Sequence, residues 1–246
     1  MRPHHLTILL SLLVIPCLNS AQATDTTFHL DYSTLTVLPS ATGQNLQFVS
    51  GSYLGITESQ AFQVGTGFLS LTTPSGYSLT RGGIYNLANG YDSSLDLDYR
   101  FTAKVTNGTL DALQFAFGDA TYYGRLGIGP TGYAFPGAGN NTDLGVDPKQ
   151  YHDYRITSAA NSGTFSLWID GTQAYTGNLA SSGGGSSYVY FGQPYNYSSS
   201  GYVTAEIKSI SYSNQMTVVP EASTLLPLLV SGLLVCRRKL WQKSRR

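Results

Sequence analysis

The sequence feature that most constrains the fold is a two-residue alternation of apolar and polar side chains. Apolar residues take every second position in five segments, which span residues 99–105, 113–117, 165–169, 189–191 and 203–207. Because successive side chains of a strand point to opposite faces, each segment is predicted to be a strand with one buried face. Turn-forming residues separate the segments, and no stretch between the terminal segments shows a convincing helical period. The pattern therefore predicts an all-β, antiparallel sandwich.

The last of these segments contains a break in the alternation. Its apolar positions are odd-numbered up to Ile207 and even-numbered at Ile210 and Tyr212. An extra residue in one strand of a pair produces such a change of phase. We therefore expect a β-bulge at Lys208-Ser209.

Composition limits what the central part of the chain can do. Residues 24–218 carry seven Lys and Arg against thirteen Asp and Glu, a net charge of −6. A negatively charged surface disfavours nucleic acid as a partner. The two cysteines, Cys17 and Cys236, both lie in the terminal segments, so the domain between them can form neither a disulfide nor a Cys–His dyad. Burial and hydrogen bonding must hold it together.

The first 23 residues have the pattern of a secretory signal peptide. Arg2 precedes an apolar stretch over residues 6–18, and Ala21 and Ala23 provide a small-residue cleavage site. We expect signal peptidase to cut after Ala23. The exported domain then spans residues 24–216.

Residues 217–246 have the pattern of a transmembrane anchor. An apolar helix is expected over about residues 224–236, followed by a basic end over residues 237–246 that includes Arg237 and Arg238. At about 1.5 Å per residue this helix is shorter than the roughly 30 Å hydrocarbon core, but the residues upstream nearly complete the span. The cations predict that the C-terminus stays on the cytoplasmic side of the inner membrane, with the domain outside.

Pro220 and Glu221 complete a three-part arrangement of Pro-Glu motif, apolar helix and arginine cluster. This arrangement resembles the bacterial PEP-CTERM sorting tail. The resemblance implies that an exosortase-type membrane peptidase cuts near the motif and that the mature protein reaches the cell surface or the extracellular medium. Ala222 stands where that family usually has a second proline, so whether the tail is cleaved stays open.

A second resemblance covers residues 151–212. His152-x-Tyr-Arg-Ile, followed by Phe-x-Leu-x-Ile-Asp-Gly ending at Gly171, is similar to a hairpin of concanavalin A-like lectin/glucanase sandwiches, including laminin-G-like domains. Residues 186–212, with a Phe-Gly pair before a loop and a strand, resemble the closing strands of that fold. The resemblance implies a concanavalin A-like jelly roll, a fold that does not by itself decide function.

Acidic residues are the first candidates for chemistry. Hydrolases of the resembled fold carry a Glu-x-Asp-x-x-Glu strand, and glycosidases need two carboxylates about 5–9 Å apart. The domain holds only two glutamates, Glu58 and Glu206, whereas Asp96 and Asp98 share one face of a predicted strand. The aspartates are either solvent-facing strand residues or a catalytic or metal-binding pair. We expect no hydrolysis.

Calcium and histidine chemistry are the next candidates. Asn141, Asp143 and Asp147 place hard oxygen ligands in one loop, a composition that suits calcium and equally suits turns. His152 begins a predicted strand and matches a structural position of the resembled family. We expect no cofactor, with calcium as the open alternative.

Aromatic residues on the polar faces of strands give the clearest sign of binding. Trp168 alternates with apolar neighbours and is expected to point outward, as are Tyr188 and Tyr190. Their rings can stack on the CH groups of a sugar, with Gln114 and Arg100 supplying hydrogen bonds. The alternative is that loops cover these rings as a second small core.

Together these inferences predict an exported, non-enzymatic bacterial surface or extracellular-matrix protein that binds an extracellular polysaccharide through an aromatic-bearing sheet face. Two alternatives stay open. A purely structural matrix component without a ligand requires the outward rings to be buried. A degenerate or unusual glycoside hydrolase requires two carboxylates that converge in a groove.

Overall fold

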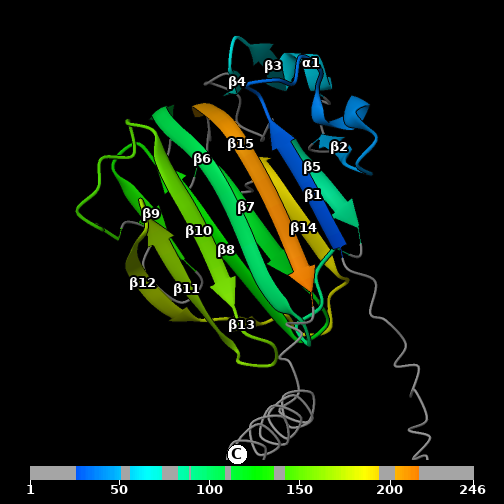
Figure 1. Ribbon diagram of the computed structural model, residues 1–246, viewed down its shortest axis with the longest axis vertical. Helices are drawn as coiled ribbons and strands as arrows, with labels where there is room; N and C mark the ends of the chain where they lie inside the picture. Colours follow the sequence, from blue (N-terminus) through cyan, green and yellow to red (C-terminus); the bar gives the residue numbers. More distant parts are fainter. Residues whose placement is uncertain are drawn as a thin grey trace, which may run out of the picture.

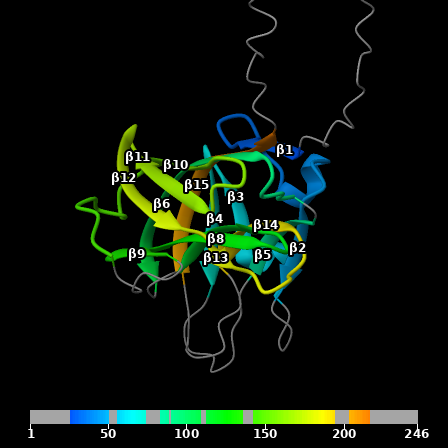
Figure 2. The ribbon, with the colours of Figure 1, turned by 90° about the horizontal axis from the view of Figure 1, so that it is seen from below.

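The computed structural model describes residues 26–50, 56–73, 83–88, 90–108, 112–135, 142–193 and 203–215. The predicted signal peptide with Ala23, and the predicted tail with Pro220, Glu221, Arg237 and Arg238, lie outside these ranges. Within them, the chain forms two antiparallel sheets stacked in two layers (Figure 2). No helix in the described part of the chain is long and apolar enough to cross a membrane.

Sheet A has eight strands. Its order is β12 (Thr172–Asn178), β11 (Thr164–Ile169), β10 (His152–Ser158), β6 (Asp96–Gly108), β15 (Val203–Gln215), β4 (Phe68–Thr73) and β3 (Phe62–Gly65), and β1 (Thr26–Asp31) pairs with β15. The 13-residue strand β15 pairs with β6 on one side, and on the other side with β4 along its first half and β1 along its second (Figure 1). The first and last strands of the described chain therefore meet in the middle of one sheet.

Sheet B forms the second layer and has seven strands. Its order is β13 (Ala180–Ser181), β8 (Tyr122–Gly129), β7 (Leu113–Gly118), β14 (Tyr188–Gln193), β5 (Gly83–Ala88) and β2 (Gln47–Ser50), and β9 (Gly132–Ala134) pairs with β8. β7, β8 and β9 follow one another in the sequence, whereas the other neighbours in this sheet come from distant parts of the chain, so the two sheets are connected by crossovers between layers.

Aromatic side chains fill the space between the sheets. Phe101 of sheet A stacks on Phe115 of sheet B with an interplanar angle of 9°. Tyr99, also on β6, makes edge-to-face contact with Phe115 and with Tyr212. Each of these rings is at most 2% exposed. Large rings remove much apolar area from water per residue, which suits a domain that lacks disulfides.

The predicted alternation of burial is confirmed on β6 and β11, but not on β7, where all six residues are buried. On β6 the buried residues alternate with half-buried or exposed ones along almost the whole strand. The pairing of β15 with β6 shifts register between Ile207 and Ser209, which confirms the predicted bulge. The turn between β11 and β12 has φ values of 50° at Asp170 and 78° at Gly171, as a tight hairpin of the Asp-Gly type requires.

Two short helices depart from the expectation of a helix-free domain. They are the 3-10 helix η1 (Pro39–Thr42) and the α-helix α1 (Glu58–Ala61). Helix α1 begins with a capping box in which Thr57 and Gln60 satisfy each other's backbone N–H groups. A four-residue helix is too short to show a helical period, so the alternation analysis could not detect it.

Candidate functional site

The outer face of sheet A carries polar side chains from four adjacent strands. Cross-strand register places Arg100 of β6 beside Ser211 of β15 and Arg155 of β10. Arg155 in turn lies opposite Trp168 of β11. One step along the strands, Asp98 lies between Ser213 and Thr157. The outward positions of β6, β10, β11 and β15 thus form a continuous polar surface.

An ion-paired cluster occupies the middle of this surface. Arg100 donates to both carboxylate oxygens of Asp98, with Nε–Oδ1 at 2.9 Å and Nη2–Oδ2 at 2.6 Å. Arg155 donates to the same two oxygens from the other side, each at 3.0 Å. Burial alone would raise the pKa of Asp98, but the hydrogen bonds and charges of the two arginines outweigh it and lower this pKa below its usual value. Asp98 therefore stays a carboxylate that fixes both guanidinium groups.

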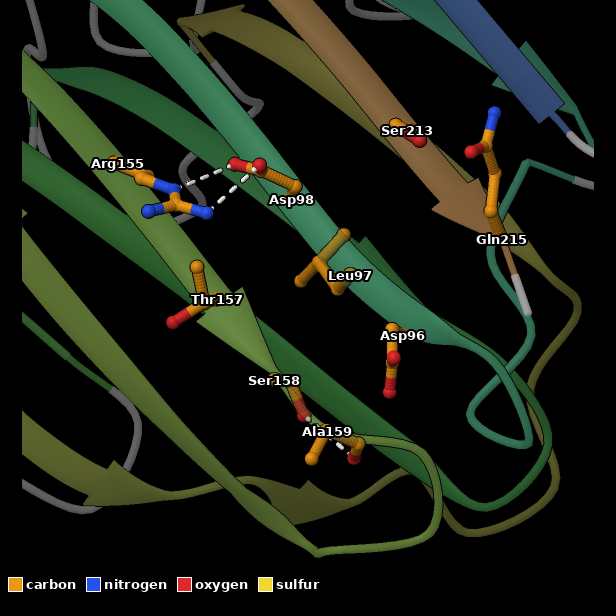
Figure 3. Close-up of a pocket in the computed structure, with 9 residues that line it drawn as sticks. All are labelled: Asp96, Leu97, Asp98, Arg155, Thr157, Ser158, Ala159, Ser213 and Gln215. Carbon is orange, nitrogen blue, oxygen red and sulfur yellow. Dashed lines mark hydrogen bonds and ion pairs between the residues drawn. The ribbon is translucent and has the colours of Figure 1, made fainter. Parts of the chain in front are cut away.

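Two shallow hollows flank this cluster. The aspartate hollow has a volume of about 480 Å³ and is lined by Asp96, Leu97, Asp98, Arg155, Thr157, Ser158, Ala159, Ser213 and Gln215. Figure 3 shows Asp98 and Arg155 joined across its upper edge, with Asp96 and Ser158 below them. The tryptophan hollow has a volume of about 470 Å³ and is lined by Arg100, Phe101, Thr102, Asp153, Tyr154, Arg155, Trp168, Gly171, Ser209 and Ser211. Arg155 lines both hollows, so we treat them together as the sheet A furrow.

Trp168 lies at the β11 side of the furrow. Its neighbours Phe165, Leu167 and Ile169 are at most 4% exposed, whereas Trp168 is half-buried on the outer face. The predicted outward orientation is thus confirmed. The indole Nε1–H donates to Thr157 Oγ1 at 3.4 Å, a long contact that still orients the ring along β10.

The start of β6 is held by a buried amide. Asn214 is 1% exposed; its Oδ1 accepts the N–H of Asp92 at 2.7 Å, and its Nδ2 donates to the carbonyl of Asp96 at 3.1 Å. The Asp96 side chain then accepts the backbone N–H of Ala160 at 2.7 Å. These bonds fix the rim of the aspartate hollow.

Sheet B carries the other predicted aromatic residues. Tyr188 and Tyr190 lie on the outer face of β14 with ring centroids 5.7 Å apart and an interplanar angle of 17°. The Tyr190 hydroxyl donates to Gln114 Oε1 at 2.9 Å, and Gln114 is only 4% exposed. A Cβ atom at Gly118 would lie 2.9 Å from the Tyr188 ring, so this ring packs directly over β7.

The five predicted sugar-binding residues therefore do not form one site. Trp168 and Arg100 line the tryptophan hollow on sheet A, whereas Tyr188, Tyr190 and Gln114 pack against one another on sheet B, the other layer of the sandwich. Alternation identified which residues point outward, but it could not assign strands to sheets.

Arg155 and Asp98 are central to the furrow, although neither was predicted from the sequence to bind a ligand. Asp98 was considered only as an acid, and Arg155 only as part of the hairpin pattern. The available signal was the alternation itself, because Arg155 occupies an outward position between buried Tyr154 and Ile156.

The acids of this face are not arranged as a catalytic pair with Glu206. Glu206 pairs with Lys104, six positions along β6 from Asp98, which corresponds to about 20 Å. Its carboxylate lies 3.1 Å from Lys104 Nζ and accepts a hydrogen bond from Tyr151. Asp96 and Asp98 do line one hollow, but the carboxylate of Asp98 is ion-paired with Arg100 and Arg155.

His152 has both ring nitrogens in contacts. Nδ1 lies 2.6 Å from Asp170 Oδ2, and Nε2 lies 3.0 Å from the carbonyl oxygen of Asp147. Asp170 also accepts the N–H of Asp153 at 2.9 Å, and this bond, together with the contact to His152, lowers the pKa of Asp170. The imidazole connects the β11–β12 turn to the loop before β10, a structural position as expected.

The calcium candidates act as turn formers where the structure describes them. Asp143 Oδ1 accepts the N–H of Gly145 at 2.7 Å, and Asp147 Oδ1 accepts the N–H of Lys149 at 3.1 Å. Asn141 lies outside the described residues. Within the described ranges, no group of three or more His, Cys, Asp or Glu is placed to hold a metal ion.

Comparisons with known proteins bear on the fold and not on the activity. No protein-family model and no curated protein matches the sequence. The structure is similar to a sialidase with a TM-score of 0.52 and 11% identity, over 78% of this chain and 19% of that one, so it spans about a fifth of the sialidase chain. Arcelin-5, a lectin-like defence protein from Phaseolus vulgaris, matches at a TM-score of 0.47 and 13% identity over 79% of this chain and 100% of arcelin-5. A β-glucanase from Bacillus licheniformis matches at 0.44 and 15% over 76% and 97%.

The chain is an all-β, antiparallel sandwich of two sheets, as the alternation predicted. At these identities the likeness shows the fold alone.

Proposed function

We propose that this protein binds a polysaccharide, without hydrolysing it, in the sheet A furrow. The observation that supports this proposal is the meeting of the two hollows at Arg155, with Trp168 at one side and a fixed Asp98–Arg100–Arg155 cluster in the middle. A binding site needs an apolar surface together with a few oriented polar groups, and the furrow offers both.

The cluster is suited to hydroxyl-rich ligands because its groups are already fixed. A guanidinium has five N–H donors, and Arg100 and Arg155 each use two of them on Asp98. The other donors can bond to sugar oxygens without first ordering a long side chain, which lowers the entropic cost of binding. Serine and threonine hydroxyls of β15 and β10 surround them.

Trp168 supplies the apolar surface. A half-buried indole whose N–H is already bonded presents its ring to a ligand, and sugar CH groups pack on such a ring. The tyrosines of sheet B lack a comparable setting, because they stack on each other and the Tyr190 hydroxyl donates to the buried Gln114.

The test is a binding measurement on the full chain with matched variants. A glycan array followed by polysaccharide pull-down should give signal for the unmodified protein, and Trp168→Ala should lower affinity by about tenfold or more, a loss of about 1.4 kcal/mol. Tyr190→Ala, which removes an outward aromatic from the other sheet, is the matched control and should retain binding once its folding is verified. Binding lost in Tyr190→Ala and kept in Trp168→Ala would overturn the assignment to sheet A.

Hydrolysis of the bound polysaccharide is the alternative function, and it can be tested with the same protein. Asp96 and Asp98 both line the aspartate hollow, which is what a hydrolase would need at minimum. We expect no release of reducing ends from bound polysaccharide. If reducing ends appear and Asp96→Asn abolishes them, the non-enzymatic proposal is wrong.

A further inference from the structure

Resting on the proposed function, we infer that the ligand is a linear chain of sugar units long enough to occupy both hollows at once, rather than a single sugar. The two hollows have nearly equal volumes of about 480 and 470 Å³, and both lie within the size range of complete small-ligand sites. Two adjoining sites of similar size suit a ligand made of repeated units.

The hollows follow the direction of β6 and β15. The tryptophan hollow covers the cross-strand pairs Thr102–Ser209 and Arg100–Ser211, and the aspartate hollow covers Asp98–Ser213 and Asp96–Gln215. From Thr102 to Asp96 the strand advances about 20 Å. A single sugar could contact only part of this length.

Small side chains keep the furrow continuous along β15. Ser209, Ser211 and Ser213 occupy its three consecutive outward positions beside the furrow. Beyond Ser209 the surface changes, because the ammonium groups of Lys104 and Lys208 both contact the Tyr151 ring, at 4.6 and 3.9 Å from its centroid. The ligand path is therefore expected to leave the tryptophan hollow toward Trp168 and Gly171 on the β11 side.

Binding two linked units in adjoining sites makes the second contact intramolecular, so affinity should rise with chain length until both hollows are filled. The probes are two ladders that run from disaccharide to octasaccharide, one of neutral β-1,3-glucan and one of oligouronates. For the ladder that binds, we expect an affinity gain of at least about tenfold between the shortest and the longest members.

Ser211→Tyr and Ser213→Tyr form a matched pair of blocking variants. Both serines lie on the outer face of β15, two residues apart, and a tyrosine there would fill the tryptophan hollow in one variant and the aspartate hollow in the other. Each variant should lose the length-dependent gain, and Ser213→Tyr should keep the affinity of short oligomers. Ser70→Tyr, on β4 outside the furrow, is the control and should behave as the unmodified protein. Thermal unfolding verifies that all three variants fold.

The outcomes separate the two proposals. Equal affinity for short and long oligomers, or a length gain that survives in both blocking variants, would overturn the inference while leaving polysaccharide binding intact. Absence of binding to every polysaccharide, or binding unaffected by Trp168→Ala, would overturn the proposed function itself.

Discussion

At the residue scale, Asp98 determines the arrangement of the furrow. It lies 57 positions from Arg155 in the sequence, yet it accepts two hydrogen bonds from that residue and two from Arg100. Register also places the two arginines directly opposite each other, where like charges repel. The alternation showed that each of these residues points outward. Their meeting depends on the pairing of β6 with β10, which a single sequence does not encode in any local pattern.

Asp98→Asn tests this cluster by its pH dependence. Because the folded pKa of Asp98 lies below its usual value, its contribution to stability is present above about pH 4 and is lost as pH falls through the folded pKa. With side chains 30–55% exposed, the pairs are screened, so we expect a cost of only about 0.5–1 kcal/mol at neutral pH. Urea unfolding should show the full difference at pH 7 and a progressively smaller one as pH is lowered below about 4. A pH-independent difference would contradict an electrostatic role.

At the element scale, strands with clean alternation were predictable and their partners were not. Strands β6, β7, β11, β14 and β15 lie where the alternation predicted them, including the bulge on β15. The strands before residue 90 show a weaker alternation of apolar and polar residues. Helix α1 was not predicted, because its four residues form only about one helical turn. The sequence also could not predict that Trp168 and Tyr190 lie on different sheets, because outward residues of both sheets show the same alternation.

Gly171→Ala tests the turn that ends β11. The φ of Gly171 is 78°, and a Cβ atom there would meet nothing within 4 Å, so only backbone strain opposes the substitution. We expect a loss of about 1–2 kcal/mol in the free energy of unfolding. Gly185→Ala is the matched control, because Gly185 has no positive φ and its nearest atoms lie 4.0 Å away; its effect should stay within about 0.5 kcal/mol. Equal costs in urea unfolding would exclude strain at Gly171.

At the scale of the whole molecule, the structure confirms the predicted sandwich. The roles of the two terminal segments stay predictions, because those segments lie outside the described residues. We propose that the protein is exported, with a precursor held in the inner membrane by residues 217–246. The basis is the charge and hydropathy pattern of the sequence, with six basic residues in the last ten.

Removal of residues 217–246 tests that proposal by cell fractionation. The full chain should be found in the envelope, and the shortened chain should move to the periplasm or the medium, because the apolar helix and its cations are gone. A variant with Arg237 and Arg238 replaced by Gln keeps the apolar segment and separates the effect of charge from that of hydrophobicity. An unchanged distribution of the shortened chain would contradict anchoring.

The central place of β15 in sheet A has a consequence for how the domain is made. Its residues Val203–Gln215 pair with β6, β4 and β1, so a nascent chain that ends before residue 203 leaves three strands without a shared neighbour. Contacts between positions so far apart are formed late and slowly. The native layers are thus completed only after residues 203–215 have been synthesised. This order of folding suits the export that we propose above, because a chain that is still unfolded can pass through a narrow translocation channel.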